Sequence, residues 1–273
     1  MYLPVVVGAD GSEPGLRAVD WAADEAALHG VPLLVVFGSL WERYEGAALA
    51  HELGGPSAHV TSEAILRTAA RRARRRHPGL PVTTEAVPDE AERALVRAGR
   101  NASLTVVGDR GRGGIADRLL GCVSRTVAAE SDCPVVVVRG NHDNRAAGGP
   151  PGRVVVGIGE APDAVLRLAF TEARLRGADV TAVRAWRRPA HETARSYEER
   201  AAEALAEALD GAPSDVTVRR LTAEGPARAV LPAASAEAGL LVIGRRTQGR
   251  LGRVAHTVLH HTACPVVIVP ERT

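Results

Sequence analysis

The sequence contains no lysine, and all 34 of its basic residues are arginine. A phosphate loop of the Walker type needs a lysine to reach the β- and γ-phosphates, so this route to nucleotide binding is excluded. Aromatic residues make up only 3% of the chain. Valine, leucine and alanine must therefore build the hydrophobic core.

Cysteine is also scarce. The three cysteines, Cys122, Cys133 and Cys264, cannot all pair with one another, and none lies in a Cys-x-x-Cys or zinc-binding spacing. This usage predicts a reducing, cytoplasmic compartment. Cys133 and Cys264 each precede a strongly apolar run, so we expect them to be small core residues.

Long apolar runs and a strong charge imbalance are missing as well. No apolar run approaches the ~20 residues that a membrane-spanning helix needs, so no membrane partner is expected. The strand-like run Val5–Val7 lies close to the first residue, which argues against a secretory leader. The net charge is +2, too small to indicate nucleic acid. The arginine-rich run 71–76 ends an expected helix, where cations are favourable without any nucleic-acid partner.

Four segments of the first half return in the same order in the second half. They are Val5–Gly8 and Val154–Gly157, Glu25–Gly30 and Glu172–Gly177, Leu104–Gly108 and Leu240–Gly244, and Cys133–Val138 and Cys264–Val269. Such ordered matches indicate a tandem duplication. Between the copies, a stretch rich in Gly, Pro, Asn and Arg is typical of a linker. We expect a first domain over residues 1–140, a linker over 141–152 and a second domain over 153–273.

Strand-like and helix-like runs alternate within the first copy. Strands are expected near Val5–Gly8, Leu33–Phe37, Val82–Ala86, Leu104–Gly108 and Val135–Val138, and helices near Pro14–His29, Thr61–Arg76, Glu90–Asn101 and Val123–Ser131. This alternation predicts an α/β fold in each copy, with a five-stranded parallel, doubly wound sheet and helices on both faces. Ligands of such sheets bind beyond the carboxyl ends of the strands, where the strand order reverses.

A glycine-rich loop follows the fourth expected strand of the first copy. It runs Gly108-Asp109-Arg110-Gly111-Arg112-Gly113-Gly114, and Gly121-Cys122-Val123-Ser124 then leads into a helix. Glycine lets the backbone approach a ligand closely, and the free N–H groups at a helix start attract anions. Arg110 and Arg112 add positive charge. From the glycines alone, the loop is either a phosphate site or an ordinary connection.

The spacing Gly108-x2-Gly111-x9-Gly121, followed by a small polar position, resembles the ATP-binding signature of the universal stress protein family. The stretch Val6–Ser12 resembles that family's first strand and loop, and the run Cys-Pro-Val-Val-Val-Val resembles its last strand. The resemblance covers essentially the whole chain, once per copy, and is to the tandem-domain members of actinobacteria. It implies an adenine nucleotide alpha hydrolase-like fold in each copy.

The resemblance also implies roles for particular residues of the first copy. Asp10 would contact the adenine or the ribose, backbone near Gly38 would meet the adenine, and the loop glycines would hold the ribose and phosphates. Cys122, Val123 and Ser124 would line the helix start, with Cys122 in place of the family's usual Ser or Thr. The implied ligand is ATP, or AMP or ADP, together with magnesium. The implied binding residues are Gly8, Asp10, Gly38, Gly108, Gly111, Gly121, Cys122, Val123 and Ser124.

The second copy departs from this pattern. Asp10 has no acidic counterpart, and the loop between the fourth strand and the Cys-Pro pair is five residues shorter. Thr247 replaces the middle glycine. Arg253 replaces Cys122 and is expected to crowd the site with a long side chain. We therefore expect a degenerate site in a copy that folds and pairs with the first.

No Ser-His-Asp set or other catalytic arrangement is recognisable in the sequence, so no catalytic residue is assigned. His256 and His260 have a spacing that can bind metal on a helix, but no third ligand is evident and no metal site is assigned. The expected function is an ATP-binding regulatory protein of the stress response with one nucleotide per chain. The alternatives are a slow ATP hydrolase or phosphotransferase, and an interaction scaffold without bound nucleotide.

The last expected strands of the two copies, Val135–Val138 and Val266–Val269, are very apolar and lack the charges that usually protect an edge strand. We expect them to pair within one chain, in agreement with the pairing known in the family. The resemblance implies a homo-oligomer such as a dimer as well. No nucleic-acid partner is expected.

Overall fold

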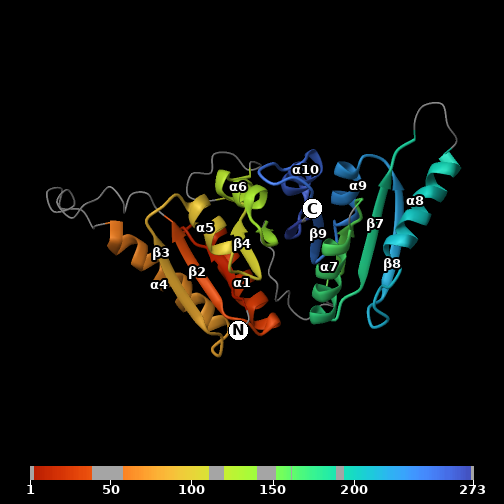
Figure 1. Cartoon of the computed structure of the whole chain (residues 1–273). Helices are drawn as coiled ribbons and strands as arrows, with labels where there is room; N and C mark the ends of the chain where they lie inside the picture. The colour runs from red at the N-terminus through yellow and green to blue at the C-terminus, as the bar shows by residue number, and fades with distance from the viewer. Residues whose placement is uncertain are drawn as a thin grey trace. The chain divides into compact units, whose positions relative to one another are not determined.

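The computed structural model describes residues 3–38, 58–110, 120–139, 152–160, 162–188 and 194–271. The chain divides into two compact units, residues 1–145 and 146–273, which we call the first and the second unit. In both, strands and helices alternate along the chain (Figure 1).

The first unit contains five strands among its described residues. In chain order its elements are β1 (Val5–Gly8), α1 (Glu13–His29), β2 (Leu33–Gly38), α4 (Ala58–Arg76), β3 (Val82–Val87), α5 (Ala91–Gly99), β4 (Leu104–Gly108), α6 (Cys122–Glu130) and β5 (Val135–Val138). The expected elements of the first copy are confirmed: three strands have the expected bounds, and the ends of the other elements differ by at most three residues.

The second unit repeats this order. Its elements are β6 (Val154–Gly157), α7 (Asp163–Arg176), β7 (Val180–Trp186), α8 (Ala194–Ala208), β8 (Val218–Glu224), α9 (Ala227–Ala234), β9 (Leu240–Arg245), α10 (Arg253–His261) and β10 (Val266–Pro270). Each of the four repeated sequence segments therefore falls on the same element in both units.

All strand pairs within each unit are parallel. The strand order is β3-β2-β1-β4-β5 in the first unit and β10-β9-β6-β7-β8 in the second. In each, the chain moves outward from the first strand to the third and then returns to the other side of the first. The order therefore reverses between β1 and β4, and between β6 and β9, which are the positions where this fold places ligands.

Helices cover both faces of each sheet. In the first unit α1 and α4 contact each other and pack on the sheet, while α5 and α6 form a second contacting pair. In the second unit α9 and α10 form the corresponding pair, and α7 and α8 pack on β6 and β7. Each unit is thus the doubly wound α/β domain that the alternation of strands and helices predicts.

Matching glycines end the first helix of each unit. Gly30 follows α1 with φ 65°, and Gly177 follows α7 with φ 60°, so both adopt the left-handed conformation. In each case the glycine N–H donates to carbonyls in the last turn of its helix. This C-cap suits glycine because a Cβ is unfavourable at positive φ. The repeat therefore preserves a helix stop as well as an apolar pattern.

The central strands are built from valine, as the scarcity of aromatics predicts. In β1, Val5, Val6 and Val7 are at most 1% exposed, and the equivalent valines of β6 are fully buried. Continuous apolar runs suit strands with both faces covered. The edge strand β3 differs, because its middle residues Thr83, Thr84 and Glu85 are exposed.

Candidate functional site

The carboxyl ends of β1 and β4 lie side by side and bring together several residues of the expected nucleotide site. The two strands pair in parallel, with Val7 opposite Val106, so that Gly8 and Gly108 end neighbouring strands. The start of α1 lies against the end of β4, since a Cβ on Gly108 would be 2.8 Å from the carbonyl oxygen of Pro14. The loop after β1 and the loop after β4 therefore meet at the point of strand reversal.

Asp10 lies in the loop between β1 and α1, where its carboxylate is held by Ser12. Its Oδ1 accepts hydrogen bonds from the Ser12 backbone N–H at 2.9 Å and from the Ser12 hydroxyl at 2.6 Å. Ser12 is also the N-cap of α1, and its hydroxyl oxygen accepts from the Gly15 N–H at 3.2 Å. The helix start thus fixes the acidic side chain that was expected to meet the ligand.

The start of α6 is joined to the end of β4. The Gly121 N–H donates to the Asp109 carbonyl at 2.8 Å, and the Ser124 hydroxyl donates to the Gly108 carbonyl at 2.5 Å. Gly121 is the N-cap of α6 and provides no side-chain hydrogen bond. The first N–H groups of α6 therefore have neither an intrahelical partner nor a side-chain cap.

Ser124 lies in the first turn of α6, as expected for a residue that lines the helix start. Its side chain is buried, at 3% exposed, and its hydroxyl is engaged inside the domain. What Ser124 offers to a ligand in this arrangement is its backbone N–H. Cys122 is exposed and Val123 is half-buried, so both lie at the accessible start of the helix.

A charged group follows β4 directly. Asp109 is 4% exposed, and its Oδ2 lies 3.8 Å from Nε of Arg110. Burial lowers the pKa of Arg139, while the Asp109 charge raises it and the Arg110 charge lowers it further. Among the described residues, Oδ1 of Asp109 has no hydrogen-bond partner. A buried carboxylate with an open lone pair is thus held beside two arginines at the start of the glycine-rich loop.

Gly8 and Gly38, two further glycines of the expected binding set, are also required for packing against a helix. A Cβ on Gly8 would be 2.8 Å from the side chain of Leu95, and one on Gly38 would be 2.7 Å from Cα of Ala91. Both neighbours belong to α5, so these glycines let that helix approach the sheet. Gly111 and Arg112 lie outside the described residues.

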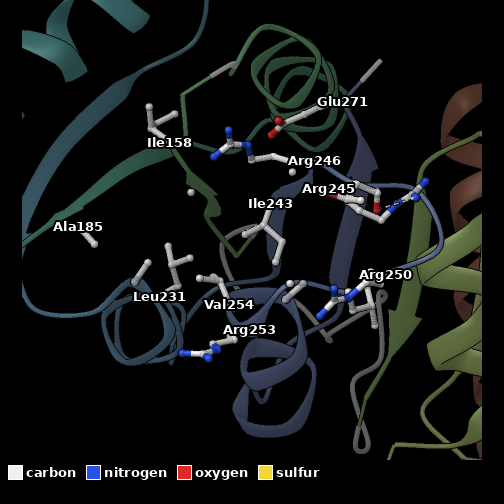
Figure 2. Close-up of a pocket in the computed structure, with 18 of the residues that line it drawn as sticks. Ile158, Ala185, Leu231, Ile243, Arg245, Arg246, Arg250, Arg253, Val254 and Glu271 are labelled. Carbon is white, nitrogen blue, oxygen red and sulfur yellow. Dashed lines mark hydrogen bonds between the residues drawn. The ribbon is translucent and has the colours of Figure 1, made fainter. Parts of the chain in front are cut away.

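The described structure contains a cavity of about 680 Å³ in the second unit, at the reversal point between β6 and β9. Figure 2 shows the apolar side chains Ile158, Leu231, Ile243 and Val254 on its wall. Arg253 lines this cavity and is exposed.

Sequence reasoning missed this cavity and most of its charged residues. When the two copies are compared, the lost glycines and the shorter loop of the second copy indicate loss of a site. The sequence comparison does not show how much space the remaining side chains leave. The signal that could have found the site is the density of arginine in the shortened loop, at Arg245, Arg246, Arg250 and Arg253.

Among the described residues, no helix is both long enough and apolar enough to cross a membrane.

Comparison with known proteins identifies the family. The model of the universal stress protein family matches residues 1–139 and 151–270. A universal stress protein of Mycolicibacterium smegmatis is 33% identical, covering 98% of this chain and 97% of its own length. One of Mycobacterium tuberculosis is 31% identical, with the same coverage.

A solved universal stress protein from Archaeoglobus fulgidus has the same fold, with a TM-score of 0.75 at 19% identity and 98% coverage of both chains. Both units of the present chain contain the strand order and the helix layers described above. With a family match in each half, the chain belongs to the universal stress protein family and carries two of its domains in tandem.

Proposed function

We propose that this universal stress protein is an adenine nucleotide-binding regulator of the stress response, with one ATP bound per chain in the first unit. The observation that carries the proposal is the meeting of Asp10, Gly108 and the uncapped start of α6 at the reversal point between β1 and β4. An α/β sheet of this type binds ligands at that point.

The chemistry of this arrangement suits a nucleotide. The uncapped N–H groups at the start of α6 can donate hydrogen bonds to an anion, and the helix dipole adds to their attraction for phosphate. The Asp10 carboxylate, fixed by Ser12, is an acceptor for a ribose hydroxyl or a base amino group. Donors for the phosphates and an acceptor for the nucleoside thus stand on adjacent loops.

Magnesium accompanies the phosphates in this proposal, and Asp109 is the residue that would hold it. Its buried Oδ1 has no hydrogen-bond partner among the described residues. Carboxylate oxygens are ligands that Mg²⁺ prefers, and a bound cation would satisfy this one. Arg110 and Arg139 are close enough to limit the negative charge that the site presents to a phosphate.

The matched variants Gly111→Val and Thr247→Val test which unit binds the nucleotide. The two positions correspond in the repeat, one in each loop. Titration calorimetry with ATP should show one site per chain, lost in Gly111→Val and retained in Thr247→Val. Two equivalent sites, or binding that survives Gly111→Val, would contradict the assignment to the first loop.

The alternatives differ in what happens to ATP. Sustained release of phosphate with Mg²⁺ over many turnovers would identify a hydrolase or phosphotransferase. The absence of both a copurifying nucleotide in mass spectra and heat on ATP addition would favour a scaffold. Retention of an adenine nucleotide without turnover is the result that we expect.

Pairing of the last strands of the two domains, assembly into a homo-oligomer and a cytoplasmic location stay predictions from the sequence. A disulfide formed in the double variant Val138→Cys, Val269→Cys would support the strand pairing. Failure to form this cross-link under oxidising conditions would count against it.

A further inference from the structure

The cavity of the second unit has the size and the wall of a small-molecule site. Its volume of about 680 Å³ is within the usual range for such sites. Ile158, Leu231 and Ile243 are each no more than 7% exposed, and they come from the loop after β6, from α9 and from β9. The wall is therefore apolar and formed by separate elements of the sheet and the helices that cover it.

Arginines lie around this apolar wall. Figure 2 shows Arg246, Arg250 and Arg253 on different sides of the cavity, and all three are exposed. Arg246 forms an ion pair with Glu160 at 2.9 Å. Among the described residues, the guanidinium groups of Arg250 and Arg253 have no hydrogen bond or ion pair. Two cationic side chains at the cavity thus lack a counterion from the described parts of the chain.

The position of Arg253 has no evident benefit for the stability of the fold. It is the first residue of α10, whose N-cap Gly252 provides no side-chain hydrogen bond. A cation at this end opposes the helix dipole, which is unfavourable. An anion bound beside Arg253 would reverse this effect, because the dipole, the uncapped N–H groups and the guanidinium would all attract it.

An acidic side chain limits how much negative charge the cavity accepts. Glu271 lines the cavity, and its side chain lies against Gly244 at the end of β9. Its backbone N–H donates to the Arg245 carbonyl at 3.0 Å, which fixes the chain at this point. Burial raises the pKa of the Glu271 carboxyl group, while the Arg246 charge lowers it and the Glu160 charge raises it. The two arginines without a counterion then remain for a ligand.

We propose that this cavity binds a small phosphomonoester with an apolar organic body, held by Arg250 and Arg253 against the wall formed by Ile158, Leu231 and Ile243. A phosphomonoester carries about −1.5 to −2 charges at neutral pH, which matches two guanidinium groups. Gly159 stands where the first unit has Asp10, so no carboxylate is present there to select a nucleoside. The ligand is therefore recognised by its phosphate and its apolar body, and the inference does not depend on the nucleotide proposed for the first unit.

The probe for this proposal is 1-naphthyl phosphate, titrated calorimetrically into the full chain. Inorganic phosphate and 1-naphthol are the two half-ligand controls. We expect the intact probe to bind at least about tenfold more tightly than either control, since each control lacks half of the contacts. Equally tight binding of inorganic phosphate would reveal an adventitious anion site only. Equally tight binding of 1-naphthol would reveal an apolar cavity only. Both results would overturn the proposal.

Variants locate the binding within the molecule. The double variant Arg250→Gln, Arg253→Gln should weaken binding of 1-naphthyl phosphate at least about tenfold, because charged hydrogen bonds are lost. Arg167→Gln, on an exposed position of α7, is the matched control and should bind as the wild type does. Glu271→Gln should strengthen binding severalfold by removing a like charge. Binding that the double variant retains in full would place the probe elsewhere and refute the site.

The same double variant separates this inference from the proposed function. Its melting temperature should be no lower than that of the wild type, and its affinity for ATP should be unchanged, because both arginines are exposed and lie outside the first unit. Loss of the naphthyl phosphate site with ATP binding retained supports the second site alone. A chain that binds the probe but no ATP would refute the proposed function and leave this inference standing.

Discussion

The Asp24 carboxylate is held by the Arg76 guanidinium in a bidentate pair, with Nε and Nη2 donating at 2.6 and 2.7 Å to its two oxygens. Nε2 of His77 lies 2.7 Å from the same carboxylate. Asp24 is on α1, whereas Arg76 ends α4, so the group fastens the two helices that share one face of the sheet. At 8% exposed, Asp24 is largely removed from water, which makes its partners energetically important.

Replacing Asp24 by Asn should destabilise the first unit by about 3 kcal/mol, because Arg76 would be left without its buried counterion. Urea unfolding of the variant measures this loss. The control is Arg75→Ala, since Arg75 is exposed and should change the free energy of unfolding by less than about 0.5 kcal/mol. Equal stability of the two variants would show that the Asp24 group does not hold α4 in place.

The arginine-rich run shows what the sequence could and could not reveal. It indicated a helix end, and α4 does end at Arg76. Besides Arg76, Arg72 forms a bidentate pair with Asp20, at 2.7 and 2.6 Å. Two acids four residues apart on one helix face two arginines four residues apart on another. This matched spacing is visible in the sequence, but only the fold shows that α1 and α4 are neighbours.

The three cysteines should differ sharply in reactivity. Burial raises the pKa of Cys264 to about 11 and raises that of Cys133 as well, whereas Cys122 is exposed at the start of α6. The thiolate is the reactive form, so a thiol reagent at pH 8 should modify one cysteine quickly in the native protein. Cys122→Ser should remove this fast phase. Two fast thiols in the wild type would contradict the burial of the other pair.

Glu271 should make stability depend on pH. Burial raises the pKa of its carboxyl group, so the folded state holds this proton more tightly than the unfolded chain does. The resulting stabilisation is complete below the unfolded pKa of about 4.3 and is lost as the pH rises through the raised folded value. Melting curves across this window should show the wild type losing stability relative to Glu271→Gln. A constant difference between the two would argue against the raised pKa.

The paired helix stops offer a test of the repeat itself. Gly30→Ala and Gly177→Ala should each cost about 1 kcal/mol, because alanine at a left-handed C-cap is strained. Gly79→Ala is the control, since a Cβ there meets open space and its φ is not in the left-handed region. Differential scanning calorimetry of the three variants compares the losses. A larger loss in the control would remove the conformational explanation.

Most of the first unit's architecture could be predicted because local patterns and the fold agree. Valine runs, the glycine stops and the Ser12 cap each specify their element independently. The cavity of the second unit could not be predicted in the same way. Its volume depends on how Leu231 and Ile243 pack across separate elements, and a comparison of loop lengths contains no such information.

Gly15→Ala should weaken ATP binding without unfolding the protein. Gly15 is buried in the first turns of α1, and a Cβ there would be 2.5 Å from Oδ1 of Asp10 and 3.3 Å from Oγ of Ser12. Alanine is favoured over glycine in a helix by about 1 kcal/mol, so the helix itself should not suffer. The added methyl group must instead displace the Asp10 carboxylate from the position that Ser12 gives it.

Titration calorimetry should therefore show ATP affinity at least about tenfold lower in Gly15→Ala, since hydrogen bonds weaken steeply when their geometry changes. Gly159→Ala, at the position that corresponds to Asp10 in the second unit, meets open space and should leave ATP affinity unchanged. Melting curves of both variants check that the fold is retained. A Gly15→Ala protein that melts and binds ATP as the wild type does would mean that the position of Asp10 does not matter for the nucleotide.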